Sequence, residues 1–316
     1  LAIAADRIMS FTSFEIRRFA STWAGLRSFV ADKTPVVGFD GELDGFFSLH
    51  GAMPVMGELW KQQQLVGFHA ISTPYQDRSH FDAQNVLESG LARPDGSADG
   101  WLNRTLSLRP DSARRGLSVG AGTPLIMRGA APVGSWAPSQ LPVADPTLVD
   151  RLVPLWANDP LLARMLPQGR ELQAMTCGMG GDASSGRMAG LLEQVGKLMA
   201  RADGPRIVAM DSDGWDMHGT LLFHMNRLAA DLDQGIARLR STLGDAWSQT
   251  AVLIASEFGR TPKINASAGR DHWSRVFSIA LAGGGLKRGK FYGDSDATSS
   301  EPEKNPTPLE DLHATL

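Results

Sequence analysis

The chain has 316 residues, and 31 Lys and Arg stand against 34 Asp and Glu, which gives a formal net charge of -3 at pH 7. Without a basic surplus, a nucleic-acid partner is not expected. No apolar run approaches the roughly 20 residues that a membrane-spanning helix needs. The only cysteine, Cys177, excludes an internal disulfide and a cysteine-rich zinc site. The length suffices for one large α/β domain with a full core.

The first 45 residues predict a helix-like start followed by "TPVVGFDGELDGFF". Pro35, Gly38 and Gly45 interrupt this stretch, so short strands and turns are expected there. Further along, the apolar spacing predicts a helix over Met53–Gln64, a strand over Leu65–Ser72 and a helix over "FDAQNVLESG" that Gly90 ends.

Residues from about 90 to 150 are rich in Gly, Pro, Ser and Ala, which predicts an insertion more than a layer of the core. One strand pair, "GLSVG" with "TPLIMRG", is expected inside it. The next segment predicts two short helices, and Pro160 suits the first turn of the second. Their expected apolar faces consist of Leu148, Leu152, Leu155, Leu161, Leu162 and Met165.

Helices and strands alternate in the last third of the chain. Helices are predicted over "SGRMAGLLEQVGKLMARADG" and "TLLFHMNRLAADLDQGIARLRSTLG", and strands over "PRIVAMDSD", "TAVLIASEF" and "VFSIALAGGG". Such alternation is typical of a parallel sheet with helices on both faces. The expected fold class is therefore α/β, a three-layer sandwich with a mostly parallel central sheet.

Two acid–imidazole pairs lie beyond predicted strand ends. Asp216 and His218 stand in "GWDMHG", where residues i and i+2 of an extended chain point the same way. Asp271 and His272 stand in "GRDHW". Because the carboxyl ends of neighbouring parallel strands open into one crevice, the pairs are expected to meet there and to hold a metal ion. The alternatives are that Asp216 caps the following helix and that His218 is structural.

A third group follows the predicted strand that ends near Ser72. Ser79 is a candidate nucleophile or the N-cap of the next helix, and His80 is a candidate ligand or base. Arg78 is a candidate clamp for an anionic substrate. Arg260 is either a second clamp or only the partner of Glu257.

Several motifs together resemble one family, the bacterial exported proteins known as domain of unknown function 1501, in the alkaline-phosphatase and sulfatase-like superfamily. The resemblance covers about residues 45–316. The motifs that carry it are "RSHFDAQNVLESG", "GWLNRTL", "PLIMRGAAPVGSW", "GWDMHG", "SEFGRTPKIN", "GRDHW" and "DLHATL". It implies an alkaline-phosphatase-like sandwich with a metal-supporting crevice, export to the periplasm by a twin-arginine signal, and hydrolysis of a phosphate or sulfate ester.

The resemblance also implies roles for single residues. Asp216 and His218 would bind one divalent metal, and Asp271 and His272 would contribute to a second. His313 in "DLHATL" would complete the ligand set. Ser79, which lies upstream of the metal pairs as the superfamily order expects, would be the nucleophile. Zinc, manganese, magnesium and calcium are all left open, and the expected partner is an anionic small molecule or ester substrate.

The N-terminal segment departs from the family pattern. The Arg-Gly-Gly-x-Asp-Gly-Leu-like turn, whose Asp would be an early metal ligand, is absent, and a core strand is expected to be missing with it. Ser21–Asp40 is instead similar to the C-terminal part of flavin-dependent oxidases of the D-amino-acid type. The predicted organisation is an atypical segment over residues 1–45 and one α/β domain over residues 46–316. Asp44 is a candidate replacement for the missing ligand.

Three functions follow from these observations. The leading hypothesis is a metal-dependent hydrolase of phosphate or sulfate esters, which the missing ligand would impair. The second is a non-catalytic exported binding or scaffold protein with the same fold. The third is a flavin-dependent oxidoreductase fragment, which only the resemblance of the N-terminal stretch supports.

The Arg17-Arg18 pair is not followed by an apolar segment, so it is not interpreted as an export signal. The sequence leaves the oligomeric state open.

Overall fold

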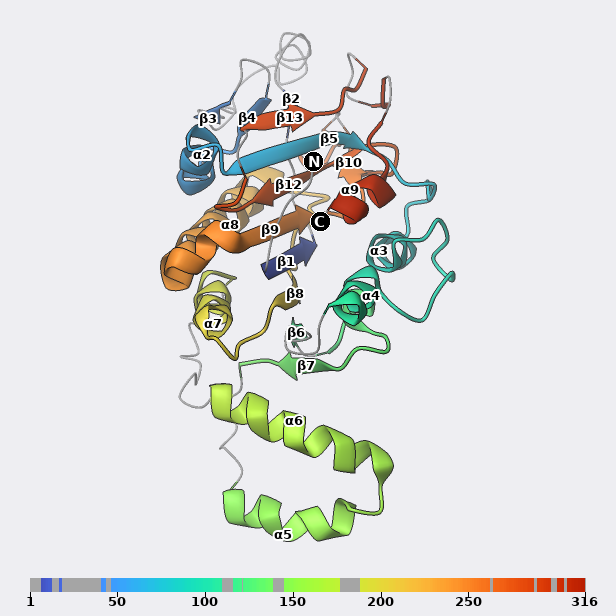
Figure 1. Ribbon diagram of the computed structural model, residues 1–316. Helices are drawn as coiled ribbons and strands as arrows, with labels where there is room; N and C mark the ends of the chain where they lie inside the picture. The colour runs from blue at the N-terminus through green and yellow to red at the C-terminus, as the bar shows by residue number, and fades with distance from the viewer. Residues whose placement is uncertain are drawn as a thin grey trace.

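The computed structural model describes residues 7–12, 17–18, 41–43, 47–109, 116–120, 122–138, 145–176, 188–261, 264–286, 289–296, 300–303 and 306–315. Within these ranges the chain forms three layers, a central sheet between two sets of helices (Figure 1). The α/β class and the sandwich architecture expected from the sequence are confirmed.

Eight strands of the described residues form the central sheet. In spatial order they are β13 (Lys290–Tyr292), β5 (Leu65–Ile71), β12 (Phe277–Ala282), β9 (Thr250–Ala255), β1 (Arg7–Thr12), β8 (Ile207–Asp211), β6 (Gly116–Val119) and β7 (Val133–Trp136). Only β12 runs antiparallel to its neighbours, β5 and β9. The cause is topological: the short strands β10 and β11, rather than a crossover helix, connect β9 to β12.

The sheet buries both of its faces, because residues along each strand alternate between two cores. In β8, Val208 and Met210 join one core, and Ile207 and Ala209 join the other. The first core is covered by α2 (Pro54–Lys61), α7 (Met188–Ala200) and α8 (Leu221–Leu243). The second is covered by α3 (His80–Ser89), α4 (Trp101–Leu108), the 3-10 turn η2 (Leu125–Met127) and α9 (Leu309–Thr315) (Figure 1).

The N-terminal segment contributes a strand to the middle of this sheet. β1 pairs in parallel with β8 on one side and with β9 on the other. The expectation that a core strand is missing was therefore wrong. Arg17–Arg18 (β2) and Gly41–Glu42 (β3) flank Phe47–Leu49 (β4) in a small antiparallel sheet. The oxidase-like stretch 21–40, Asp44 and Cys177 lie outside the described residues.

The segment expected as an insertion, residues 90 to 150, contributes instead to the core layers. β6 pairs with β8 and with β7, and Leu102 and Leu106 of α4 are fully buried. The expected partner strand "TPLIMRG" holds the 3-10 turn η2. The backbone N–H of Ile126 donates to the buried carboxylate of Glu88 at 2.9 Å, which ties η2 to α3.

The two helices expected after residue 145 are present as α5 (Pro146–Trp156) and α6 (Pro160–Thr176), but most of the apolar residues expected to be covered are exposed. Leu155 is 74% exposed and Leu161 is 55% exposed. Figure 1 shows both helices beyond the β7 edge of the sheet. Among the helices that the structure describes, none combines the length and the apolar character that a membrane crossing needs.

Helix α8 fixes the positions of two neighbouring helices through carboxylates at their N-termini. Asp233 accepts hydrogen bonds from the backbone N–H groups of Val55 at 3.0 Å and Met56 at 2.8 Å, in the first turn of α2. Asp231 accepts one from Met188 at 3.0 Å at the start of α7. Free N–H groups at a helix start need such acceptors. Burial raises the pKa of Asp233, and the two backbone hydrogen bonds oppose that rise.

The Asp233 contact predicts a measurable loss of stability. Asp233→Ala leaves two N–H groups without their acceptor in a buried place, which should lower the free energy of unfolding by about 1–3 kcal/mol. Urea unfolding at pH 7, followed by circular dichroism, measures this change. The matched control is Gln234→Ala, an exposed neighbour on the same helix. Equal urea midpoints for the two variants would contradict the capping role.

Candidate functional site

The candidate site lies where three strands of the sheet end. β5, β8 and β9 run in the same direction, so their carboxyl ends meet at one edge. The polar residues that follow them are Arg78 and His80 after β5, Asp216 and His218 after β8, and Glu257 after β9. Segments far apart in the sequence are thereby brought together at this edge.

A short hairpin adds the remaining residues. β10 (Gly259–Arg260) pairs with β11 (His272–Trp273) in antiparallel fashion, and Arg260 lies directly opposite His272. The backbone N–H of Thr261 donates to the carbonyl of Asp271 at 2.9 Å. The hairpin therefore presents an arginine and a histidine side by side.

A glycine allows this hairpin to approach the residues after β8. The N–H of Arg270 donates to the carbonyl of Met217 at 3.2 Å. At Gly269, an added Cβ would lie 2.1 Å from the carbonyl carbon of His218, so any side chain here would push the two segments apart. The contact between the two acid–imidazole motifs thus depends on a residue without a side chain.

Three imidazole nitrogens and one carboxylate converge at the centre. His272 Nε2 lies 3.0 Å from His80 Nε2 and 2.9 Å from His218 Nε2. Asp216 Oδ1 lies 3.0 Å from His272 Nε2 and 2.9 Å from His218 Nε2, and its Oδ2 lies 3.3 Å from His80 Nε2. His80, Asp216 and His272 offer ligand atoms that all lie within 4.8 Å of one another.

The other ring nitrogen of each histidine contacts an oxygen that can accept a hydrogen bond. The contacts are His80 Nδ1 to Glu257 Oε1 at 2.5 Å, His272 Nδ1 to the Arg78 carbonyl at 3.2 Å, and His218 Nδ1 to Asp271 Oδ1 at 3.4 Å. A carbonyl or an ionised carboxylate only accepts, so each Nδ1 is assigned the hydrogen. In a neutral ring, Nε2 then presents a lone pair to the centre.

This arrangement has a chemical consequence. With the three rings neutral and their hydrogens assigned to Nδ1, the Nε2 lone pairs that face one another and the carboxylate cannot satisfy each other by hydrogen bonds. A cation among them removes the conflict. Histidines that bind metals commonly donate their second ring N–H to a carboxylate or a backbone carbonyl, as all three do here. The donor set therefore fits a divalent cation.

Asp216 carries the negative charge at the centre of this group and pairs with Arg260. Arg260 Nη2 lies 2.5 Å from Asp216 Oδ1, and the Arg260 side chain is 13% exposed. Burial raises the pKa of Asp216, but the Arg260 guanidinium and the imidazoles around the carboxylate outweigh it and hold that pKa well below its usual range. Asp216 is therefore a carboxylate at any pH at which the protein would work.

Asp271 lies at the rim and orients His218. Asn265 Nδ2 donates to Asp271 Oδ1 at 3.0 Å and to the His218 carbonyl at 3.1 Å. Hydrogen bonds from Asn265 and His218 lower the pKa of Asp271. Asp271 therefore stays ionised and can accept the Nδ1 hydrogen of His218.

The structure brings six of the residues singled out in the sequence together, but it pairs them differently from the expected two-metal arrangement. The six are His80, Asp216, His218, Arg260, Asp271 and His272. Asp271 contacts His218, whereas its neighbour His272 contacts Asp216 and His80. The reason is geometric, since adjacent residues at a strand send their side chains to opposite sides. Asp216 does not cap α8, whose N-cap residue is Thr220.

Arg78 and Ser79 flank this cluster. The Arg78 guanidinium lies 5.9 Å from the centre of the Trp273 ring, and its backbone carbonyl accepts from His272. Ser79 is the N-cap of α3, where its Oγ accepts from the N–H of Asp82 at 3.4 Å. The capping alternative for Ser79 is thus observed, and a nucleophilic role stays a prediction.

His313 is not brought to the cluster. Its ring stacks on Trp101 of α4, with ring centres 4.2 Å apart. Burial, with a smaller effect of the Arg104 charge, lowers the pKa of His313 to about 3. The expectation that His313 completes the ligand set finds no support in this arrangement, because the residue belongs to the packing between α4 and α9.

Two residues of the site were not assigned from the sequence. Glu257 was weighed only as a partner for Arg260, yet it holds His80 and is 14% exposed. Asn265 was not singled out, although it links Asp271 to the His218 backbone. Glu257 had one available signal, its position two residues after β9. Asn265 had none, because its partners are defined only by the folded hairpin.

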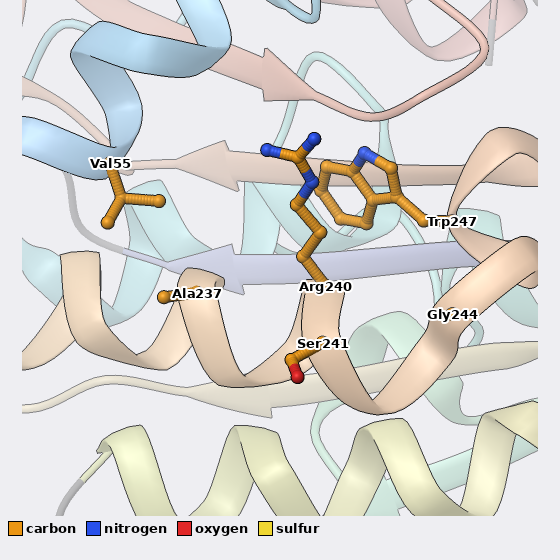
Figure 2. A pocket seen from close by; sticks show the side chains of 6 residues that line it. All are labelled: Val55, Ala237, Arg240, Ser241, Gly244 and Trp247. Carbon is orange, nitrogen blue, oxygen red and sulfur yellow. The ribbon is translucent and has the colours of Figure 1, made fainter.

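One pocket lies away from this cluster. It is an open hollow of about 510 Å³ beside the C-terminal end of α8, and Figure 2 shows the residues that line it. They are Val55, Ala237, Arg240, Ser241, Gly244 and Trp247. None of the candidate site residues is among them. Arg240 and Trp247 both donate to side-chain oxygens of the segment after α2, Gln62 and Gln64.

The comparison with protein families supports one part of the resemblance. A sequence model of the family described as "Protein of unknown function (DUF1501)" matches residues 175–316, which is less than half of the chain. This range includes Asp216, His218, Asp271 and His272, but not His80. The resemblance before residue 175, and that of residues 1–45 to an oxidase, stay predictions. No curated protein matches the sequence.

Several solved structures are similar at low sequence identity. An alkaline phosphatase from the Antarctic bacterium TAB5 is 8% identical, with a TM-score of 0.45 over 100% of this chain and 97% of that one. The C-terminal periplasmic domain of EcEptC from Escherichia coli, in complex with Zn, is 9% identical, with a TM-score of 0.43 over 99% and 84%. A phosphonate monoester hydrolase of Agrobacterium radiobacter is 12% identical, with a TM-score of 0.37 over 97% and 72%. At such identities the likeness does not extend to chemistry.

The environment of His313 predicts a pH dependence of stability. The unfolded chain binds a proton at His313 below about pH 6.5, whereas the folded protein resists it down to about pH 3. Stability is therefore lost as the pH falls through this window. His313→Phe keeps a ring on Trp101 and removes the titration, so it should reduce that loss by up to about 1.4 kcal/mol for each pH unit.

Urea unfolding at pH 7, 5.5 and 4.5 measures the difference between this variant and the wild type. His224→Phe is the matched control, because the His224 ring contacts only the neighbouring Phe223 among the described ring pairs. Parallel stability curves for the wild type and His313→Phe would contradict the assignment.

Proposed function

We propose that this protein binds a divalent metal ion at His80, Asp216 and His272 and uses it to hydrolyse an ester of phosphate or sulfate. The observation that carries the proposal is the convergence of three Nε2 atoms on one carboxylate, with each Nδ1 occupied by an acceptor. Three structural histidines would not need to share one centre in this way. A metal site needs both features at once.

The donor set narrows the choice of metal. Calcium and magnesium prefer oxygen ligands, and magnesium keeps several waters. Two or three imidazole nitrogens with one carboxylate suit zinc better, and manganese less well. Zinc is therefore the first metal to test, with His218 as the further nitrogen donor next to Asp216.

The reaction class comes from the motif resemblance, and the charges around the cluster agree with an anionic ester. A bound divalent cation would polarise the phosphoryl or sulfuryl oxygen and balance the charge that develops on it. The chain's own part is to bind and orient the anion. Arg260 lies beside Asp216, and Arg78 lies at the rim on Trp273, so two guanidinium groups flank the cluster.

Ser79 is the candidate nucleophile within the proposal. Its Oγ accepts the capping hydrogen bond from Asp82, so its own hydroxyl hydrogen is not used by that bond. It adjoins His80 in the chain. A water molecule is the alternative nucleophile, and a single substitution separates the two routes.

Metal binding is the first prediction. Isothermal titration with zinc should show one site per wild-type chain, and His80→Ala or His272→Ala should abolish it. Glu257→Gln should weaken binding about 10- to 100-fold, because it removes the carboxylate that orients His80. His224→Ala is the matched control and should bind as the wild type does. A titration that shows no zinc binding to the wild type would refute the proposal.

Turnover is the second prediction. With zinc bound, the wild type should release nitrophenol from para-nitrophenyl phosphate or para-nitrophenyl sulfate, and Asp216→Asn should abolish the release. Ser79→Ala then assigns the nucleophile: lost turnover with retained metal assigns the serine, and retained turnover assigns water. Metal binding without turnover of any ester tried would favour a non-catalytic binding protein of the same fold.

A further inference from the structure

Three nitrogen atoms crowd one carboxylate oxygen of Asp216. All three lie within 3.0 Å of Oδ1: Arg260 Nη2 at 2.5 Å, His218 Nε2 at 2.9 Å and His272 Nε2 at 3.0 Å. The two histidines are assigned their hydrogen on Nδ1. Arg260 is therefore the neighbour that donates to this oxygen, because a guanidinium has only donor hydrogens.

The described residues offer the Arg260 side chain only weak contacts besides Asp216. Its other hydrogen bonds, to the carbonyls of Arg270 at 3.4 Å and Trp215 at 3.5 Å, are at the limit of hydrogen-bond length. Its side chain is 13% exposed, so its charge is largely withdrawn from water. Among the described residues, the ion pair with Asp216 is thus the contact that balances this charge.

Arg260 is also held in place by the backbone. It lies opposite His272 in the β10–β11 pair, which keeps its backbone beside the cluster. A divalent cation at His80, Asp216 and His272 would share the carboxylate with a guanidinium that can only shift locally. Two cations on one carboxylate repel each other, most strongly where water is excluded.

We propose that Arg260 is the cation that Asp216 binds in the metal-free protein, and that it competes with the metal for this carboxylate. The inference rests on the proposed metal site and deepens it. Metal binding weakens the Arg260–Asp216 ion pair and releases guanidinium hydrogens toward the same centre. Those hydrogens are then free to bind the oxyanion of a substrate, so metal loading and anion binding are coupled.

The test measures zinc binding and metal-free stability rather than activity. Arg260→Gln removes the competing charge, so zinc should bind roughly tenfold or more tightly than to the wild type. Arg260→Lys keeps the charge and should stay close to the wild type. Without metal, Arg260→Gln should unfold at a lower temperature, because Asp216 then lacks its cation, and zinc should raise the unfolding temperature of this variant more than that of the wild type.

Arg275→Gln is the matched control. Arg275 lies in the same region and pairs with Glu301 at 3.6 Å, so this variant should bind zinc as the wild type does. Equal or weaker zinc binding by Arg260→Gln, with normal binding by the wild type, would overturn the competition and leave the metal site intact. No zinc binding by the wild type or by either Arg260 variant would refute the metal site itself, and the competition with it.

Discussion

The whole site depends on where three hydrogens lie. Glu257, Asp271 and the Arg78 carbonyl each accept a hydrogen from the Nδ1 of a different histidine, and these three bonds turn three Nε2 lone pairs toward Asp216. A single such contact is common in proteins, since any partly buried histidine needs a partner. Three that converge on one carboxylate are costly unless a positive charge is shared among them. The acceptors therefore define the centre as much as the ligands do.

The fold provides the rigidity that such an arrangement needs. The strands that lead to the cluster are buried on both faces, and α8 is fixed against α2 and α7 by its two carboxylates. The hairpin that carries Arg260 and His272 is itself short, and its position comes from close backbone contact at Gly269 rather than from a large core. A well-packed scaffold thus carries a short hairpin that places Arg260 and His272 beside the cation position.

The sequence predicts the parts of this structure that depend on local pattern. Periodicity identified α7, α8, β5, β8, β9 and β12, and the rule of shared strand ends brought Asp216 and His272 together. It could not predict that Glu257 orients His80, because that contact joins residues 177 positions apart. It also overvalued His313, whose stacking on Trp101 depends on the packing of α9 against α4. The central place of β1 was missed because pairing on both sides, not its own composition, determines it.

Arg260 connects these observations. In a scaffold protein, an arginine buried beside a carboxylate is a sufficient explanation for both, and the histidines around them would be expected to bond outward. Here the histidines bond outward only through Nδ1, and the Nε2 atoms of His218 and His272 crowd the same Asp216 oxygen that the arginine holds. The Arg260 guanidinium does not also donate to the three Nε2 atoms, because its closest N–H donates to Asp216. The proposed exchange accounts for this crowding: Arg260 pairs with Asp216 in the metal-free protein, and the metal ion takes its place when it binds.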